Sequence, residues 1–345
     1  MRAIIQTERE RGGIEFGEHE RSDPAPDEAL VKVHTAGLCG SDAHAYKYTA
    51  GFEWIPVPRV MGHEYSGEVV EVGENVVDLQ PGDKVVESPI HDCGHCFQCK
   101  NDQSNVCANF KVTGMHNDGC YTEYTTVGER HLHKVPEAVP LDEAAITEPT
   151  SIAARAVLER GTIQPGQNVL VEGPGPIGIL TGAIADARGA NVVVSGLGAD
   201  TKYRLPLAQE LGLETVDIEN EDLDAFTENY TDGIGFDAIF DTTGHPSGVE
   251  NAAEQIRRGG EIIVIGLPTG ESEVFFTPLV RGEVDVNTSY GSTWRNFEQA
   301  LRLIENGDID AKTIMDTSYS VEEPVEAFED FLAGETCKPV FRFWD

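Results

Sequence analysis

The chain of 345 residues is longer than one hydrophobic core usually supports, so two domains are expected. Sixty acidic residues against 25 basic ones give a formal net charge of −35, which repels nucleic acid and anionic lipid. No apolar run approaches the ~20 residues that span a bilayer, and the opening MRAIIQTERERGG holds no apolar signal segment. We therefore expect a cytoplasmic protein that binds neither nucleic acid nor membrane.

The acidic residues are spread along the chain, as in residues 219–229 (ENEDLDAFTEN) and 320–330 (SVEEPVEAFED), instead of forming one tail. Such an excess strains a compact state by self-repulsion in dilute salt. Repulsion is screened at high salt, because the Debye length falls to ~3 Å at 1 M. We expect a halophilic protein working in a high-salt cytosol; an ordinary acidic enzyme is the alternative.

The first 150 residues contain short segments in which apolar and polar residues alternate between Gly and Pro turns. This pattern predicts β-strands and a barrel-like β region instead of a helical one. The clearest segments are residues 29–37 (ALVKVHTAG), 64–73 (EYSGEVVEVG) and 83–87 (DKVVE).

From residue 151 the pattern changes to helices and strands in alternation. A helix is predicted over residues 151–161, ending at Gly161. Strands are then predicted at residues 168–173, 191–196, 236–241 and 261–266, with helices between them at 177–189, 202–212 and 249–260. Alternation of this length predicts right-handed βαβ units and a parallel sheet. Further strands are expected at residues 284–291 and 338–344, and helices at 296–307 and 323–334.

The segment CGHCFQCKNDQSNVC carries the strongest local signal. It holds four of the seven cysteines at C-x2-C-x2-C-x7-C spacing, namely Cys93, Cys96, Cys99 and Cys107. Four thiolates in one loop match the closed tetrahedral site of a structural zinc ion, and this crowding favours a reducing compartment. Free thiols that happen to cluster are the alternative, and a nucleic-acid-binding zinc ribbon is disfavoured by the net charge. His95 lies within the run, but four cysteines leave it no vacancy.

A second set of metal-ligand residue types is scattered: Cys39, His63, Glu64 and Glu148. A catalytic zinc ion takes three protein ligands from cysteine, histidine and carboxylate and keeps one open position. Residue type alone favours a structural interpretation of each, such as a buried thiol, a core histidine or a carboxylate at a helix start. Their spacing in the chain does not establish that they converge.

The segment NVLVEGPGPIGIL places Gly173, Gly175 and Gly178 in a G-x-G-x-x-G pattern. An apolar strand precedes it and an amphipathic helix follows, which is the context that dinucleotide binding requires. The glycines let the backbone approach a pyrophosphate at the helix N-terminus. A tight strand–helix turn without a ligand is the alternative.

The end of the next predicted strand bears on the choice between NAD and NADP. An acidic residue there would bind the ribose 2′-hydroxyl of NAD, but Ser195 and Gly196 occupy the position. Lys202 and Arg204 follow closely and could accept a 2′-phosphate, although Asp200 complicates this interpretation. The sequence favours NADP, with NAD as the alternative.

Five segments, taken in order, resemble the zinc-containing medium-chain dehydrogenase family, specifically its polyol, threonine and glucose dehydrogenase branch. They are GLCGSD, GHEYSGEVVEVG, the four-cysteine lobe, ITEP and GPGPIG. The resemblance covers nearly the whole chain. It implies an α/β protein with a GroES-like β-barrel catalytic domain at residues 1–150 and 285–345, including a structural zinc lobe at about 90–110. A Rossmann domain with a doubly wound parallel sheet is implied at residues 151–284.

The resemblance also implies a catalytic zinc site. Cys39 and His63 resemble direct ligands, and Glu64 resembles the third ligand of the polyol-like branch. Glu148 stands where typical alcohol dehydrogenases have a cysteine ligand, so its carboxylate could bind zinc directly or through water. The choice between the two glutamates stays open.

Three further residues resemble parts of the family's catalytic machinery. Asp42 resembles the acid that orients a ligand histidine, and Ser41 and His44 resemble the proton relay. The expected cofactor-binding positions are Gly173, Gly175, Pro176, Ile177, Gly178, Ser195, Gly196, Lys202, Arg204 and Gly266. Cys120 departs from the family pattern, since small or apolar residues are common at its position.

The function implied is zinc-dependent oxidation of a sugar or polyol hydroxyl, with hydride transfer to NAD(P) and two zinc ions per chain. The alternatives are threonine oxidation at its 3-hydroxyl and a non-catalytic zinc-binding protein of the same fold. A homodimer or homotetramer is expected, with contacts at apolar sheet edges such as residues 284–291. The whole interpretation depends on a metal held by Cys39, His63 and a glutamate facing the dinucleotide.

Overall fold

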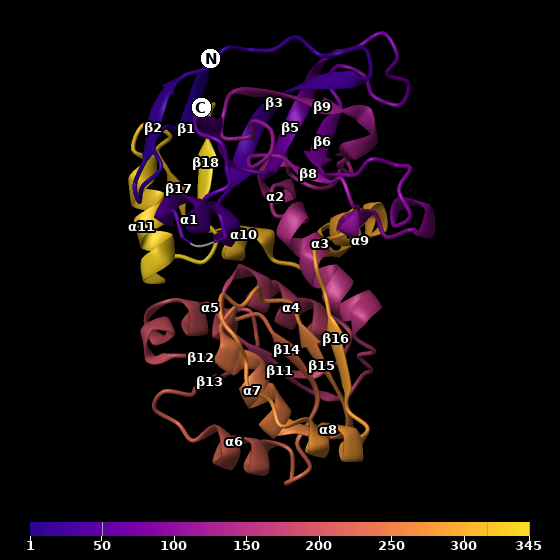
Figure 1. The fold of residues 1–345 in the computed structure, drawn as a ribbon, viewed down its shortest axis with the longest axis vertical. Coiled ribbons are helices and arrows are strands. Elements are labelled where there is room, and N and C mark those ends of the chain that lie inside the picture. Colours follow the sequence, from indigo (N-terminus) through magenta and orange to yellow (C-terminus); the bar gives the residue numbers. More distant parts are fainter. Residues whose placement is uncertain (50, 316, 345) are drawn as a thin grey trace. The chain divides into compact units, whose positions relative to one another are not determined.

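The computed structural model describes residues 1–49, 51–315 and 317–344. The chain forms two compact units, each built from separate stretches of sequence (Figure 1). We call the first the barrel unit; it comprises Met1–Ser151, Gly291–Gly307 and Ile314–Asp345. We call the second the parallel-sheet unit; it comprises Ile152–Tyr290 and Asp308–Thr313.

The barrel unit is built on β-sheets, as the alternating segments predict, and their named strands pair antiparallel except for β17 with β18. Its largest sheet has the strand order β10-β6-β5-β3-β18-β17, with β9 also paired to β3. These strands span Leu132–Lys134, Lys84–Glu87, Glu64–Val72, Glu28–Gly37, Val340–Arg342, Ser318–Tyr319 and Tyr124–Gly128. A smaller sheet has the order β2-β1-β4, spanning Ile14–Glu18, Arg2–Gln6 and Arg59–Val60. Apolar residues of both sheets and of the C-terminal helix α11 (Pro324–Ala333) share one core.

Two helices of the barrel unit lie where the sequence predicted none: α1 (Gly40–Lys47), which follows β3 closely, and α2 (Leu141–Ala144). Helix α3 (Thr147–Arg155) continues in a wider helical turn to Arg160, so it confirms the helix predicted over residues 151–161 and begins four residues earlier. The expectation of a purely β region was wrong because the residues of α1, GSDAHAYK, show almost no helical apolar periodicity. In contrast, helix α9 (Trp294–Asn306) has a marked apolar face and confirms the helix predicted at residues 296–307.

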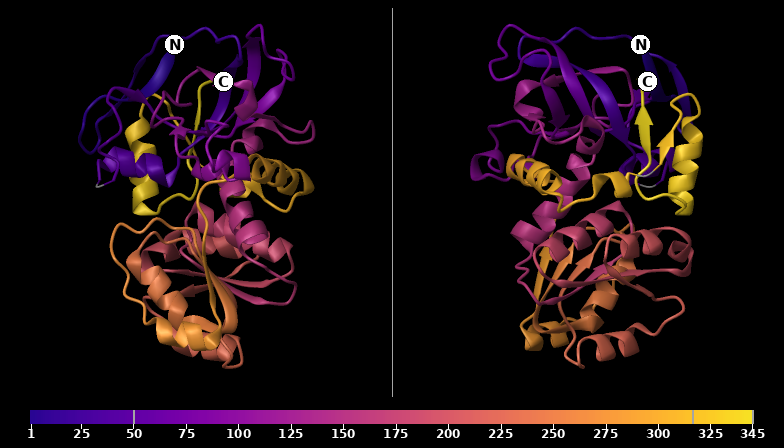
Figure 2. Two further views of the ribbon diagram at one scale, coloured as in Figure 1. Left: turned by 45° about the vertical axis from the view of Figure 1, so that its right-hand side comes forward. Right: turned by 180° about the vertical axis from the view of Figure 1, so that it is seen from behind.

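The parallel-sheet unit has the strand order β13-β12-β11-β14-β15-β16, with every neighbouring pair parallel. These strands span Glu214–Asp217, Asn191–Gly196, Asn168–Glu172, Phe236–Asp241, Ile256–Val264 and Asp285–Thr288. The chain runs outward from β11 to one edge and then from β14 to the other, which creates a switch point between β11 and β14. This doubly wound order confirms the predicted Rossmann architecture, and Figure 2 shows helices flanking the sheet.

The helices of this unit connect successive strands. They are α4 (Pro176–Ala187), α5 (Arg204–Glu210), α6 (Leu223–Tyr230), α7 (Pro246–Gln255) and α8 (Phe276–Gly282). Helix α7 ends at Gln255, so the helix predicted over residues 249–260 was too long. Ile256 pairs with β14 instead, and Gly259 adopts a φ of +66°, which lies outside the right-handed helical region.

Strand β16 pairs with β15 and therefore extends the parallel sheet beyond residue 284, where the sequence placed the end of the Rossmann domain. Strand β16 confirms the strand predicted at residues 284–291, and α8 joins it to β15. Among the described residues, no helix is both long and apolar enough to cross a bilayer.

Candidate metal and dinucleotide sites

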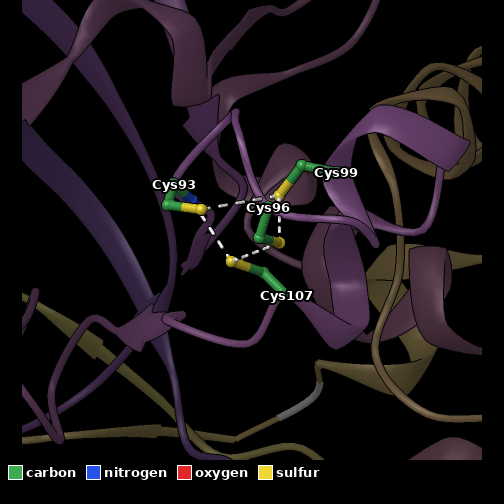
Figure 3. Close-up of side chains that lie close together, drawn as sticks. All are labelled: Cys93, Cys96, Cys99 and Cys107. Atoms are coloured by element: carbon green, nitrogen blue, oxygen red, sulfur yellow. Dashed lines mark hydrogen bonds between the residues drawn. The ribbon is translucent and has the colours of Figure 1, made fainter.

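The four cysteines of the lobe converge in the loop between β7 (Ile90–His91) and β8 (Lys111–Val112). Figure 3 shows their sulfur atoms turned toward a common centre. The sulfur–sulfur distances are 3.4 Å for Cys96–Cys99, 3.7 Å for Cys96–Cys107 and 4.0 Å for Cys93–Cys99. Sulfurs at the corners of a tetrahedron with bonds of ~2.3 Å to zinc lie ~3.8 Å apart. The cluster therefore has the dimensions of a tetrahedral thiolate zinc site.

The backbone around this cluster favours thiolate at some positions. The backbone N–H of His95 lowers the pKa of Cys93 to about 6, whereas burial raises the pKa of Cys99. The backbone N–H groups of Cys93 and Asn109 donate to Cys107 Sγ, each at 3.3 Å. The side chain of His95 is exposed, with Nδ1 2.6 Å from the Cys93 carbonyl oxygen, so it stands outside the donor set as predicted.

Cys39, His63 and Glu64 form a second cluster, with one ligand atom of each lying within 4.8 Å of those of the others. Strand pairing explains the convergence. Gly37, the last residue of β3, lies opposite Glu64, the first residue of β5, so Cys39 beyond one strand end meets His63 before the other. Thiolate, imidazole and carboxylate are a donor set that zinc accepts, with one position left open. These residues fit a catalytic zinc ion.

Asp42 holds the parts of this cluster together from helix α1. Its Oδ2 accepts hydrogen bonds from Cys39 N at 3.2 Å and from Tyr121 Oη at 3.0 Å, and its Oδ1 accepts from Gly62 N at 3.3 Å. The Oδ1 atom also lies 3.7 Å from His63 Nδ1, which has no hydrogen-bond partner among the described residues. Burial raises the pKa of Asp42. Asp42 is thus placed to orient the histidine ring.

The two candidate third ligands differ in their surroundings. Glu64 accepts hydrogen bonds at both carboxylate oxygens from Lys338 Nζ, at 2.9 Å and 2.6 Å. Glu148 lies on α3 and is 8% exposed; burial, followed by the charge of Glu64, raises its pKa to about 7. It is outside the group formed by Cys39, His63 and Glu64. The sequence did not point to Lys338, because its partner lies 274 residues away.

The two expected relay residues share helix α1 but have different neighbours. Ser41 Oγ lies 3.5 Å from His63 Nε2, at the metal cluster. His44 stacks on Phe52 with ring centroids 5.4 Å apart, and its Nδ1 lies 3.4 Å from Thr49 Oγ1. Burial lowers the pKa of His44, which keeps the ring neutral near pH 7. No hydrogen bond joins Ser41 to His44 within the described part of the chain.

The glycine-rich turn of the parallel-sheet unit has the geometry that its pattern predicts. Gly173 has a φ of +95°, and a Cβ on Gly178 would lie 1.9 Å from the Gly173 carbonyl oxygen. A Cβ on Gly175 would meet open space, which leaves its backbone accessible to a ligand. Pro176 is the first residue of α4, Ile177 follows it, and no side chain caps this helix start. The residues present fit a bound pyrophosphate.

The predicted specificity residues lie at the end of β12. Ser195 is buried, and Gly196 ends the strand. Lys202 is exposed, whereas the Arg204 guanidinium lies 3.9 Å from the carboxylate of Asp200. The carboxylate of Asp200 therefore offsets part of the positive charge that Arg204 could present to a 2′-phosphate. Elsewhere in the unit, the backbone N–H of Gly266 donates to the Asp241 carbonyl oxygen at 3.0 Å.

Sequence reasoning missed a buried carboxyl pair at the switch point. Glu172 ends β11 and lies opposite Asp241, which ends β14; they are 2% and 1% exposed. Asp241 accepts hydrogen bonds from Thr243 N and Oγ1, but both oxygens of Glu172 lack a partner among the described residues. Burial, aided by the charge of Asp241, raises the pKa of Glu172 well above its usual range.

Comparison with known proteins defines the class. The model of the alcohol dehydrogenase GroES-like domain matches residues 25–137, and the model of the zinc-binding dehydrogenase family matches residues 176–306. The chain therefore belongs to the zinc-dependent medium-chain dehydrogenase family, as the motifs indicated, and is an NAD(P)-dependent dehydrogenase.

Individual relatives cover nearly the whole chain. Sorbitol dehydrogenase of Halalkalibacterium halodurans is 30% identical over 341 residues, 98% of each chain. L-Threonine 3-dehydrogenase of Pyrococcus furiosus is 34% identical, covering 99% of this chain and 98% of its own.

Two solved structures have closely similar folds. A provisionally assigned zinc-binding dehydrogenase of Sinorhizobium meliloti 1021 bound to NADP has a TM-score of 0.90 at 28% identity, and the match covers 99% of this chain and 98% of that one. An alcohol dehydrogenase of Escherichia coli CFT073 complexed with NADH has a TM-score of 0.89 at 29% identity, covering 99% of both chains.

The two metal clusters predict separable effects of mutation. We expect two zinc ions in the intact chain and one in Cys39→Ser, with kcat/KM lowered about a thousandfold or more because bound metal supplies several kcal/mol to such reactions. Dinucleotide binding, followed by fluorescence, should persist. The matched variant Cys107→Ser should also lose one ion but mainly lower the melting temperature. One ion in the intact chain, or full activity in Cys39→Ser, contradicts these assignments.

The buried pair at the switch point predicts a pH-dependent stability. Folding raises the pKa of Glu172, so the folded protein favours the protonated carboxyl. The free energy of unfolding therefore falls as the pH rises from the usual carboxyl pKa toward the raised pKa of the folded state. Glu172→Gln should therefore melt higher than the wild type at pH 8, by about 2–4 °C for each kcal/mol recovered. The difference should shrink toward pH 5. Exposed Glu210→Gln is the control for loss of charge, and equal shifts in both variants would contradict the argument.

Proposed function

We propose that this dehydrogenase oxidises a hydroxyl of a sugar or polyol and passes the hydride to NAD(P). The observation that carries the proposal is the buried cluster of Cys39, His63 and Glu64, which offers three donors and an open position. The glycine turn at residues 173–178 supplies the dinucleotide site in the other unit. The relative named sorbitol dehydrogenase supports the substrate class.

The residues of the barrel unit have distinct roles in this reaction. Zinc bound at the cluster would bind the substrate hydroxyl and lower its pKa toward neutrality. Asp42, 3.7 Å from His63 Nδ1, fixes the orientation of that ring. Ser41 Oγ would take the hydroxyl proton as it releases its own, and His44, whose pKa is lowered by burial, would take up the released proton and pass it to solvent. Because no hydrogen bond joins these two side chains in the described part of the chain, a water molecule or a hydroxyl of the bound cofactor would have to link them. Transfer of hydride requires the nicotinamide to reach the substrate carbon.

Side chains near loop 110–117 support a polyhydroxylated substrate. His116 is held in place, since its Nδ1 accepts a hydrogen bond from Val112 N at 3.0 Å and its ring contacts Trp54 with centroids 4.5 Å apart. We propose that it binds a hydroxyl of the substrate, and that Asn117 and Glu148 bind others. Threonine oxidation is the second candidate because a threonine dehydrogenase is equally similar, and Arg295 could then bind the substrate carboxylate.

For the cofactor we propose NADP before NAD. The absence of an acid at Ser195 and Gly196 removes the repulsion of a 2′-phosphate, and Lys202, six residues further along the chain, is exposed. The similar protein from Sinorhizobium meliloti binds NADP, whereas the one from Escherichia coli binds NADH.

A substrate panel tests these choices. The panel consists of sorbitol, other polyols, aldoses and L-threonine, each assayed with NADP and with NAD at molar salt. We expect kcat/KM for a polyol or sugar to exceed kcat/KM for threonine by at least about tenfold. NADP should be the better cofactor. A preference for threonine would reverse the substrate ranking, and a tenfold preference for NAD would reverse the cofactor ranking.

We also propose that the enzyme is halophilic and works in a reducing, high-salt cytoplasm. The free thiols and the net charge of −35 support this. Desalting from molar KCl to about 50 mM should abolish activity and broaden or lower the melt as the Debye length grows. Restoring KCl should recover both. Full activity with a two-state melt at low salt would refute the proposal.

Finally, we propose a homodimer or homotetramer. Strand β16 ends the parallel sheet, with Val286 exposed on it. Phe275, Phe276 and Val280 are exposed nearby in sequence at helix α8, which is unusual for so acidic a chain. A second copy of this surface would cover these apolar groups, and light scattering at molar salt measures the resulting mass.

A further inference from the structure

Lys338 is a buried cation with every donor engaged. It is 1% exposed, and its Nζ donates to the Leu38 carbonyl oxygen at 2.9 Å and to Glu64 Oε1 and Oε2 at 2.9 Å and 2.6 Å. An ammonium has three protons, so these contacts satisfy it. Lys338 reaches Glu64 because β18 pairs with β3, with Val340 opposite Gly37.

These contacts show which side of the Glu64 carboxylate Lys338 occupies. An atom close to both oxygens of one carboxylate lies on the side between them, where a metal would sit if the group bound through both oxygens at once. Lys338 Nζ occupies that side. A carboxylate offers about four lone-pair sites, so a single oxygen can still bind a cation from the other side.

The carboxylate also has little freedom to turn away from the lysine. A Cβ on Gly37 would lie 2.7 Å from Glu64 Oε2 and 3.5 Å from the Lys338 side chain. Both side chains therefore pack against bare backbone at the end of β3. Glu64 is 1% exposed, so water does not offer an alternative partner.

We propose that Lys338 is a positioning residue that restricts Glu64 to binding the catalytic metal through one oxygen. A glutamate free to bind through both oxygens would fill the position that the substrate hydroxyl needs, since catalytic zinc depends on an open site. The ammonium also offsets the negative charge of Cys39 and Glu64 around the metal. This inference rests on the proposed catalytic zinc site.

Cobalt(II) substitution tests the proposal without relying on turnover. Four-coordinate cobalt absorbs visible light much more strongly than five-coordinate cobalt, so the visible band reports coordination number. The spectrum of Cys39→Ser, which retains the cysteine lobe alone, is subtracted from each variant. Lys338→Met should weaken the band from the catalytic site, whereas Lys338→Arg, which can also cover both oxygens, should leave it intact.

Metal affinity and a double-mutant cycle provide the other readouts. In Lys338→Met, competition with a chelator should show tighter zinc binding at this site, by about tenfold, at the lower end of the ~10–100-fold effects of residues behind metal ligands. In a Glu64→Gln background, which cannot bind through two oxygens, Lys338→Met should change neither the spectrum nor the affinity. This double variant removes both buried charges, so it stays testable if Lys338→Met alone does not fold.

An unchanged cobalt band in folded Lys338→Met would overturn the proposal. The proposal would also be overturned if Lys338→Met changed the spectrum and the metal affinity as much in the Glu64→Gln background as in the wild type. Failure of the proposed function gives a different result, because the wild-type chain would then bind no second cobalt ion and the difference spectrum would be blank.

Discussion

The antiparallel pairing of β3 with β5 is the constraint on which the metal cluster depends. Its register sets Gly37 opposite Glu64, so the residues just beyond one strand and just before the other meet. Asp42 then ties both sides through backbone N–H groups of Cys39 and Gly62. A shift of one residue would turn these side chains to the opposite face of the sheet and separate the donors.

Local motifs could be predicted from the sequence, whereas partners distant in the chain could not. The four cysteines and the glycine turn each lie in one short segment, so their spacing already constrains their geometry. The scattered ligands became a credible site only through the order of motifs shared with a family. Lys338 and the pair of Glu172 and Asp241 are brought to their partners by strand pairing, for which single-residue patterns carry no signal.

Secondary structure, too, was predicted well where the local sequence determines it and poorly where contacts distant in the chain determine it. Strands with alternating or continuous apolar residues were predicted closely, as β14 at Phe236–Asp241 illustrates. Helix α1 was missed because its sequence shows almost no helical apolar periodicity, although Ala43, Ala45 and Tyr46 are buried in the core. Residues 256–260 belong to strand β15 instead of to the predicted helix, and Ile256 and residues 261–264 pair with β14 on either side of an irregular register. Cofactor choice was least predictable, since Asp200 partly neutralises Arg204.

The position of β18 has a consequence for synthesis of the chain. The strand spans Val340–Arg342 but lies beside β3, which is synthesised some 300 residues earlier, so this part of the barrel closes only after residue 342 has been made. Strands β11 to β16 are contained between residues 168 and 288 and can assemble while the ribosome is still working. A nascent chain would thus acquire its nucleotide fold early, and a stalled or truncated product would lack the counter-charge of its metal centre.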